Sequence, residues 1–360
     1  MIQRRQFIGA TAAATLFAAR PAFALTTPAA AVPPAPAFDW ECREIRTIKD
    51  DAATRRPIIT GISLQNEGNL IALVGDDHMI NLYDFRTGDF VSRLRKHRDW
   101  VRAAAFSADS NSLFTCANDK KLIRWGIEGN TATPETLATQ PSAIINLAIN
   151  NAGTRIATVG HNENAFLYDN VGRRITTFRC SCDDNHAVAF SSDDSLLAIG
   201  GRNGTIRVFD VTSGLLKHEL KSHRRRIRGL EFISEDELIS AGDDQIVKMN
   251  HLGDRSKSIA LPRMATKLYA VQSVGPGLIA TSGSDNKIHI WDLISQSQVG
   301  ILRGHTGTVT CMDMSQGLFV SGSYDATIRI WTPKPNEVAN RATSNPPLPP
   351  TGSKGWTKSR

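Results

Sequence analysis

The chain of 360 residues is 41% hydrophobic and long enough to bury a sizeable core. Its five cysteines are too few for a disulfide-rich scaffold, and their odd number leaves at least one thiol unpaired. The formal net charge is +7, of which Arg4, Arg5 and Arg20 contribute three positive charges near the N-terminus. The remaining charge of about +4 is only mildly basic, which argues against a nucleic-acid-binding protein.

Residues 1–24 resemble a bacterial export signal. Arg4-Arg5 precede a mildly apolar, Ala-rich stretch that ends in Ala22-Phe23-Ala24, an A-x-A cleavage site. The run Arg-Arg-Gln-Phe-Ile is similar to the twin-arginine type, which exports folded proteins. We therefore expect cleavage after Ala24 and a periplasmic mature protein. The alternative is an uncleaved segment that anchors the protein to the inner membrane, although the apolar stretch is short and interrupted by Thr and Gly.

The composition divides the rest of the chain into three parts. Residues 25–38 are rich in Pro and Ala and indicate a linker. Residues 39–332 carry internal repeats and are predicted to form one domain. Residues 333–360 contain Pro, Ser and Lys and are expected to be a disordered tail. At the start of the repeat region, residues 40–48 indicate a strand that has no partner in sequence.

The repeat region has a regular period. Seven times an Asp or Asn is followed, six residues later, by the residue that closes a short apolar strand. The pairs are Asp77/Tyr83, Asp119/Trp125, Asn162/Tyr168, Asn203/Phe209, Asp244/Asn250, Asp285/Trp291 and Asp325/Trp331. Successive closing residues lie 42, 43, 41, 41, 41 and 40 positions apart. Such a period over most of the chain indicates one architecture built from repeats.

Each repeat is predicted to contain β-strands. In residues 304–331, three short apolar or β-branched runs are separated by Gly, Ser, Gln and Asp, and residues 327–330 alternate in polarity as a strand does. Asn203-Gly204 supplies a tight hairpin turn in the fourth repeat. A further apolar run precedes the repeats, which gives four strands per unit.

The ends of the repeats resemble the WD-repeat family. Trp291-Asp292 matches the signature pair of that family, and Gly304-His305 matches its opening Gly-His. The resemblance covers about residues 40–332 and implies an all-β fold, a seven-bladed β-propeller of four-stranded antiparallel blades around a central channel. Pro333 and Pro335 disfavour a regular fourth strand after Trp331. We therefore predict that the N-terminal strand becomes the outer strand of the last blade and closes the ring.

Two repeats carry polar sets that look like a Ser-His-Asp catalytic triad. These sets are His97, Thr115, Asp119 and Trp125 in the second repeat and His305, Ser321, Asp325 and Trp331 in the seventh. An enzyme needs its nucleophile only once, whereas a set of hydrogen bonds that stabilises the fold is needed in many blades. The resemblance implies that these positions form hydrogen-bonded structural tetrads, so we predict no catalytic residues and a protein that is not an enzyme.

The resemblance also implies a binding face, formed by the loops that lead into the first strand and those that join the second and third strands. The residues predicted there are Arg56, Arg98, Trp100, His161, Arg202, Arg224, Arg226, Lys267 and Tyr324. Arg, Trp and Tyr are the types that dominate binding hot spots. An acidic protein segment or an anionic envelope component would suit this face. The alternative is that residues 224–226 form a solvated loop.

Cys180, Cys182 and His186 lie close together in sequence and could bind a soft metal such as copper. No wider ligand cluster accompanies them, so we predict no metal and no cofactor. The leading hypothesis is a non-enzymatic scaffold or recognition module in the periplasm. The alternatives are a redox or metal-handling protein that uses these three residues, and an enzyme that uses the central channel.

Overall fold

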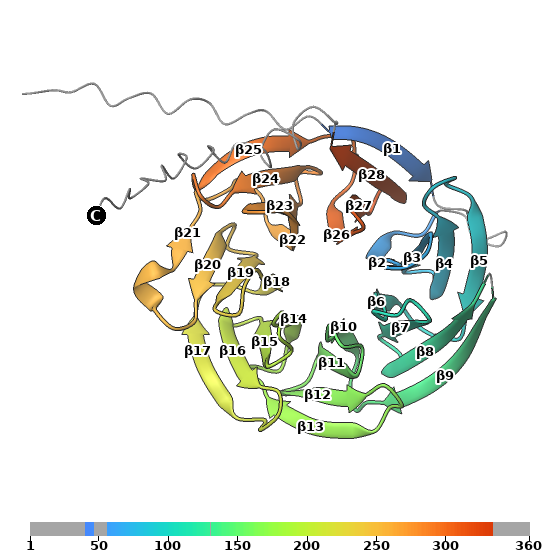
Figure 1. Cartoon of the computed structure of the whole chain (residues 1–360), viewed down its shortest axis with the longest axis horizontal. Helices are drawn as coiled ribbons and strands as arrows, with labels where there is room; N and C mark the ends of the chain where they lie inside the picture. The colour runs from blue at the N-terminus through green and yellow to red at the C-terminus, as the bar shows by residue number, and fades with distance from the viewer. Residues whose placement is uncertain (1–39, 47–55, 130, 334–360) are drawn as a thin grey trace, which may run out of the picture. The chain divides into compact units, whose positions relative to one another are not determined.

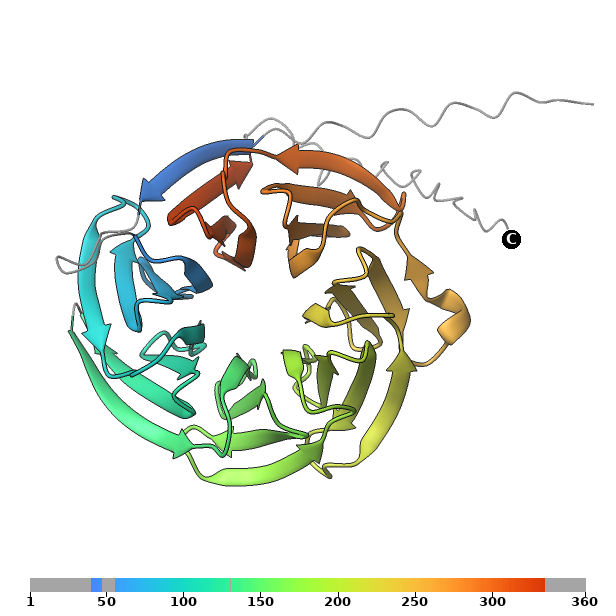
Figure 2. The same ribbon diagram turned by 180° about the vertical axis from the view of Figure 1, so that it is seen from behind.

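The computed structural model describes residues 40–46, 56–129 and 131–333, all within one compact unit of the chain. The described strands form seven four-stranded sheets, and Figure 1 shows these sheets arranged as the blades of a ring. Figure 2 shows the same ring from behind. The all-β, seven-bladed propeller expected from the sequence is confirmed. The predicted signal and linker (residues 1–24 and 25–38) lie outside the described residues. So does the predicted tail (residues 333–360), except for Pro333, which ends β28.

In each blade the innermost strand comes first and its antiparallel neighbours follow outward. The first blade contains β2 (Ile59–Leu64), β3 (Leu70–Gly75), β4 (Met79–Asp84) and β5 (Phe90–Arg95). The second contains β6 (Val101–Phe106), β7 (Ser112–Ala117), β8 (Lys121–Glu128) and β9 (Thr131–Thr139). The third contains β10 (Ile144–Ile149), β11 (Arg155–Gly160), β12 (Asn164–Asp169) and β13 (Arg174–Arg179). The fourth contains β14 (Asn185–Phe190), β15 (Leu196–Gly201), β16 (Thr205–Asp210) and β17 (Leu216–Lys221).

The remaining three blades follow the same plan with local changes. The fifth contains β18 (Ile227–Phe232), β19 (Glu237–Gly242), β20 (Val247–His251) and a short β21 (Ile259–Ala260), with the 3₁₀ turn η1 (Arg255–Lys257) before β21. The sixth contains β22 (Leu268–Gly275), β23 (Leu278–Gly283), β24 (Ile288–Asp292) and β25 (Ser297–Leu302). The seventh contains β26 (Val309–Ser315), β27 (Leu318–Ser323), β28 (Thr327–Pro333) and β1 (Trp40–Arg46). No described helix is long and apolar enough to cross a membrane.

The hydrophobic core lies between neighbouring blades. Each of seven clusters of buried side chains combines residues from two adjacent blades; one joins the first and second blades, and another joins the sixth and seventh. The second strands are covered on both faces, and every residue of β3 and β23 is buried. The outer strand β5 buries only one of its six residues. Stability therefore comes mainly from apolar packing around the ring.

The periodic Asp or Asn forms the turn between the second and third strands. Its side-chain Oδ1 accepts the backbone N–H of the residue two positions later, for example Met79 on Asp77 at 3.1 Å and Thr327 on Asp325 at 2.9 Å. In six blades the residue between them has a positive φ; these residues are His78, Lys120, Gly204, Gln245, Asn286 and Ala326. Asp and Asn favour such turns because their short side chains reach the local backbone. The Asp or Asn that recurs in the sequence is therefore the residue that makes this local hydrogen bond.

The ring closes through β1, as the sequence predicted. This strand pairs antiparallel with β28 from Trp40 opposite Pro333 to Arg46 opposite Thr327. Ile45 is buried in the cluster between the seventh and first blades. Without this strand, the outer edge of β28 would be exposed for pairing with other chains. The end of the predicted strand, residues 47 and 48, lies outside the described residues.

Candidate functional site

Two sets of loops lie at the same end of the propeller because each blade is an antiparallel meander. One set comprises the turns between the second and third strands, and the other the connections into the innermost strands. In each blade, the residue before the turn Asp or Asn donates its backbone N–H to the carbonyl of the residue directly before the innermost strand. The pairs are Asp76–Ile58, Asn118–Trp100, His161–Ala143, Arg202–Asp184, Asp243–Arg226, Ser284–Lys267 and Tyr324–Thr308. We call this end, formed by the two sets of loops, the loop face.

The structure places the nine residues predicted for binding in these loops. Arg98, His161, Arg202, Arg224 and Lys267 are exposed. The aromatic rings are also accessible, since Trp100 is 37% exposed and Tyr324 is 42% exposed. Arg56 is half-buried, and Arg226 is half-buried in an ion pair with Asp184. Residues 224–226 are therefore not one solvated run, because the third arginine has a fixed position.

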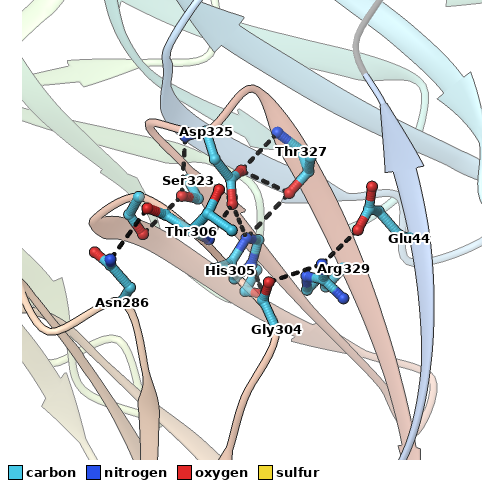
Figure 3. A network of polar contacts seen from close by, with 12 residues as sticks. Glu44, Asn286, Gly304, His305, Thr306, Ser323, Asp325, Thr327 and Arg329 are labelled. Atoms are coloured by element: carbon cyan, nitrogen blue, oxygen red, sulfur yellow. Dashed lines mark hydrogen bonds and ion pairs between the residues drawn. The ribbon is translucent and has the colours of Figure 1, made fainter.

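The polar set of the seventh blade is a chain of hydrogen bonds beneath the loop face, and Figure 3 shows the part of it that joins His305 to Asp325. The Nδ1 atom of His305 lies 3.0 Å from Asp325 Oδ2, and its Nε2 atom lies 2.8 Å from Ser321 Oγ. The indole N–H of Trp331 donates to the same hydroxyl at 2.9 Å. If Nδ1–H donates to the carboxylate, Nε2 accepts from Ser321 and every polar atom of the chain has a partner.

The second blade repeats this arrangement. His97 lies 3.0 Å from Asp119 and 2.9 Å from Thr115, whose hydroxyl also accepts from Trp125 at 2.9 Å. Neither hydroxyl is available to a substrate, because Thr115 and Ser321 are both 0% exposed. A nucleophile must reach its substrate. The geometry therefore fits two structural tetrads better than two catalytic triads.

The carboxylates of these sets are held in the ionised form. Burial alone raises the pKa of Asp325, but hydrogen bonds from His305, Thr327 and the Thr306 N–H outweigh it and lower the pKa. Burial also raises the pKa of Asp119, but the hydrogen bond and charge of His97, together with backbone hydrogen bonds, outweigh it and lower the pKa. Each carboxylate also accepts the backbone N–H after the histidine, at 2.8 Å from Thr306 and 3.0 Å from Arg98. The tetrads thereby fix the loops of the loop face.

Other blades preserve parts of the tetrad with different residues. In the fifth, the amide of Asn250 takes the role of the indole and donates to Ser240 at 2.9 Å, while His223 lies 2.7 Å from the same hydroxyl. In the third, Gln140 donates to Thr158 at 2.6 Å in place of a histidine. Asn250 lacks the aromatic ring of the pattern, yet it keeps the hydrogen bond. The sequence pattern alone did not reveal this replacement.

Gly304 explains the Gly-His pair before the seventh blade. Its φ is +144°, a conformation that side chains rarely adopt, and a Cβ there would lie 2.6 Å from the guanidinium of Arg329. Arg329 donates to the Gly304 carbonyl at 2.9 Å and forms an ion pair with Glu44 of β1 (Figure 3). Absence of a side chain at this position thus allows one arginine to join the loop face to the closing strand.

The loop face opens into a pocket of about 280 Å³ at the mouth of the channel. The second residue of every innermost strand lines it, and these residues are Thr60, Arg102, Ile145, His186, Arg228, Tyr269 and Thr310. Tyr324 also lines the pocket. Arg102 and Arg228 were not among the residues predicted for binding, although each lies two positions after one that was, Trp100 or Arg226.

Asp184 connects three neighbouring blades at this mouth. Its Oδ1 lies 3.3 Å from His161 and 2.8 Å from His186, and its Oδ2 accepts from Arg226 at 2.6 Å. Burial raises the pKa of Asp184, but His186 and Arg226 outweigh it and lower the pKa. Burial is the main reason why the pKa of His186 falls to about 4, against the opposing effect of Asp184. Asp184 was not among the residues predicted from the sequence.

The three residues considered for a metal have separate surroundings. Cys180 is buried in the core between the third and fourth blades. The thiol of Cys182 lies 3.5 Å from the Asp184 carbonyl, and His186 faces the channel pocket. All five cysteines are free thiols. Burial raises the pKa of Cys180 to about 12, so this thiol is a poor source of thiolate. The described part of the chain contains no group of three or more potential metal ligands.

Comparison with known proteins agrees with this geometry. Residues 88–125, 172–210 and 296–332 match the family described as WD domain, G-beta repeat. These three segments are therefore similar to WD repeats. U3 small nucleolar RNA-associated protein 21 of Saccharomyces cerevisiae is 29% identical over 57% of this chain and 23% of its own length. WD repeat-containing protein 26 homolog of Drosophila melanogaster is 24% identical over 66% of this chain and 46% of its own length.

A shorter relative has a length closer to that of this chain. WD repeat domain-containing protein 83 homolog of Dictyostelium discoideum is 21% identical over 69% of this chain and 74% of its own length. The first two relatives are much longer, and the match spans less than half of each. The similarity therefore concerns the WD repeats.

Proposed function

We propose that this WD-repeat propeller is a non-enzymatic interaction module that binds an acidic segment of a partner protein through its loop face. The main support is the contrast between buried and exposed polar residues. The tetrads use their polar atoms internally, whereas Arg98, Arg224 and Lys267 are exposed on the loop face beside Trp100 and Tyr324. Basic and aromatic side chains on one face suit an acidic partner and supply the residue types of binding hot spots.

The family adds support for this class of function. Proteins with WD-repeat propellers typically serve as scaffolds for other proteins, and one relative, 25% identical over 49% of this chain, is named p21-activated protein kinase-interacting protein 1-like. A catalytic role for the channel has less support, because the repeated hydroxyls are buried and satisfied by hydrogen bonds. Binding of a partner protein therefore fits the described residues better than catalysis does.

We assign the protein to the periplasm on the basis of its N-terminal sequence. The twin-arginine-type motif and the A-x-A site support export and cleavage after Ala24. Mass spectrometry of the protein from a periplasmic fraction should show a chain that begins at Leu25. Changing both Arg4 and Arg5 to Lys should retain it in the cytoplasm as the full-length chain. A processed periplasmic protein in that variant would contradict the twin-arginine assignment.

Site-specific crosslinking tests the interaction directly. A photoreactive amino acid replaces Trp100 or Tyr324 on the loop face, and in a control it replaces Ile294, which is 86% exposed in the β24–β25 turn at the opposite end. The two loop-face probes should yield the same crosslinked protein from an envelope fraction, and the control should yield none. A crosslink from the Ile294 position alone would place binding at the other end and contradict the proposal.

A further inference from the structure

Two arginines at the channel mouth have guanidinium groups held in place by an aromatic ring and an acceptor. Arg102 lies over Trp100, 5.0 Å from the ring centroid, and its Nε donates to Asn118 Oδ1 at 2.8 Å. Arg228 lies over Tyr269 at 4.8 Å, and its Nε donates to Asp243 at 2.9 Å. Such stacking and hydrogen bonding pre-organise the flat guanidinium group, so less entropy is lost when it binds a ligand.

These arginines keep donors that the described residues do not use. Within the described residues, Arg102 donates a hydrogen bond only through its Nε atom, to the uncharged side chain of Asn118, and its two terminal nitrogens donate none. In Arg228, Nη1 is likewise unused, since Asp243 accepts from Nε and Nη2. Both side chains line the same pocket as Tyr324, whose hydroxyl is within electrostatic reach of both.

We propose that the channel mouth binds the side-chain carboxylate of an Asp or Glu residue presented by a partner protein, with Arg102 and Arg228 as its anion-binding residues. This inference rests on the proposed function and names the chemistry that the centre of the loop face recognises. A guanidinium group with two free nitrogens matches the two oxygens of a carboxylate. Burial lowers the pKa of Arg102, so a bound anion would offset the cost of holding this charge away from water.

The size of the pocket favours a side chain over a free cofactor. Its volume of about 280 Å³ lies at the lower end of the range of about 300–1,000 Å³ that is typical of small-molecule sites. The pocket opens onto the loop face, where Trp100 and Tyr324 can contact the residues that flank the inserted side chain. This arrangement suits one side chain of a longer segment that lies across the face.

The local charge favours a carboxylate over a phosphate. Asp243 neutralises Arg228, and Asp184 neutralises Arg226. The pKa of His186 is lowered to about 4, so this ring is neutral at pH 7, and Asp99 partly offsets the charge of Arg102. The mouth therefore offers at most about one unbalanced positive charge, which matches a carboxylate with one negative charge better than a phosphate with nearly two.

Nuclear magnetic resonance of the arginine side chains tests this site with minimal probes. The full chain, labelled with ¹⁵N-arginine, is titrated with N-acetylglutamate amide and, in parallel, with N-acetylglutamine amide, which has the same shape without the charge. The Nε–Hε signals of Arg102 and Arg228, assigned with Arg102→Lys and Arg228→Lys, should shift with the glutamate probe alone. Equal shifts with the glutamine probe would overturn the proposal.

A matched pair of variants separates the pocket from the general basic surface. In Arg102→Gln, the glutamate concentration that half-saturates the Arg228 shift should rise about tenfold. In Arg225→Gln, which removes the same charge from an exposed loop position outside the predicted binding residues, it should change less than twofold. Comparable losses in both variants would mean diffuse attraction and would overturn the site. Unchanged backbone spectra confirm that each variant is folded.

Two further probes distinguish the sources of the anion. A nonapeptide with one central Glu and Gly-Ser flanks should shift the Arg102 signal at least as effectively as the amide does. Loss of binding in the peptide would mean that the pocket takes only free small anions, and tighter binding of inorganic phosphate would reassign it to phosphate; either result rejects the proposal. The photoreactive residue at position 100 could crosslink a partner while no probe shifts the Arg102 signal. In that case the proposed function stands and this inference fails.

Discussion

Arg329 on β28 forms an ion pair with Glu44 on β1, and these two residues are separated by 285 positions in the chain. The contact joins the start of the described propeller to its end and lies beside the loop face. Its own contribution to stability is small, because a partly exposed ion pair contributes about 0–1 kcal/mol. Its importance is positional: the residue that fixes the Gly304 carbonyl also contacts the strand that closes the ring.

The closing strand should be essential for stability through its apolar face. Ile45→Ala should lower the free energy of unfolding by about 2–5 kcal/mol, because Ile45 is buried between the seventh and first blades. Glu41→Ala, at an exposed position of the same strand, should change it by less than about 0.5 kcal/mol. Chemical denaturation measures both. Equal effects, or an unchanged melting curve after deletion of residues 38–50, would refute closure by β1.

Trp331 should contribute more through packing than through its hydrogen bond. Its ring is 3% exposed and its indole N–H donates to Ser321. Trp331→Ala should therefore destabilise the protein by about 3–5 kcal/mol. Trp331→Phe keeps much of the ring, so the lost hydrogen bond should account for about 0.5–1.5 kcal/mol of its effect. A loss below about 1 kcal/mol for the alanine variant would show that this residue is not part of the core.

Stability at acid pH should depend on Asp325. Its pKa in the folded protein is lowered, while the unfolded value is about 3.9. The folded state therefore binds fewer protons, so the contribution is fully present above about pH 4 and decreases as the pH falls below it. Unfolding measured from pH 7 to pH 2 should show a smaller acid-induced loss for Asp325→Asn than for the natural protein. Parallel curves for the two proteins would contradict the lowered pKa.

His186 should remain neutral far below the usual range of histidine. Burial is the first cause of its lowered pKa of about 4, and nearby Arg226 and Arg228 add to the shift. The ring signals of His186 in a nuclear magnetic resonance titration should therefore change little between pH 7 and pH 5. Arg228→Gln should raise its pKa. A midpoint near pH 6.5 in the natural protein would mean that the ring is exposed to water.

The sequence predicted the ring because its signals are local. The side chain of Asp325 accepts a backbone N–H two residues away. The turn therefore requires an Asp or Asn at a regular spacing, independently of the other residues of the blade. The partnerless strand at residues 40–48 and the prolines after Trp331 were enough to predict closure by β1. The tetrad residues also recur in register, which distinguished a repeated feature from a single catalytic site.

The channel mouth was harder to predict because its residues come from different blades. Arg102 and Arg228 are 126 positions apart in the chain and reach one pocket only through the curvature of the ring. Asp184 acquires its partners from the third, fourth and fifth blades in the same way. Cys180 and His186 show the converse, since neighbours in sequence face the core and the channel. Contacts between residues of different blades do not follow the pattern that recurs within each repeat, so that pattern does not predict them.

Recognition by the loop face is tested most directly by comparing two fourfold variants of this protein in affinity capture from an envelope fraction. One variant changes Arg98, Trp100, Arg224 and Tyr324 to Ala. The matched control changes Arg86, Arg173, Leu215 and Ile294, four exposed residues at the opposite end. The amount of the protein that crosslinks to position 100 is measured for each. The first variant should melt normally and capture none of it, and the control should capture as much as the natural protein. Full capture by the first variant, or loss in the control alone, would contradict recognition through the loop face.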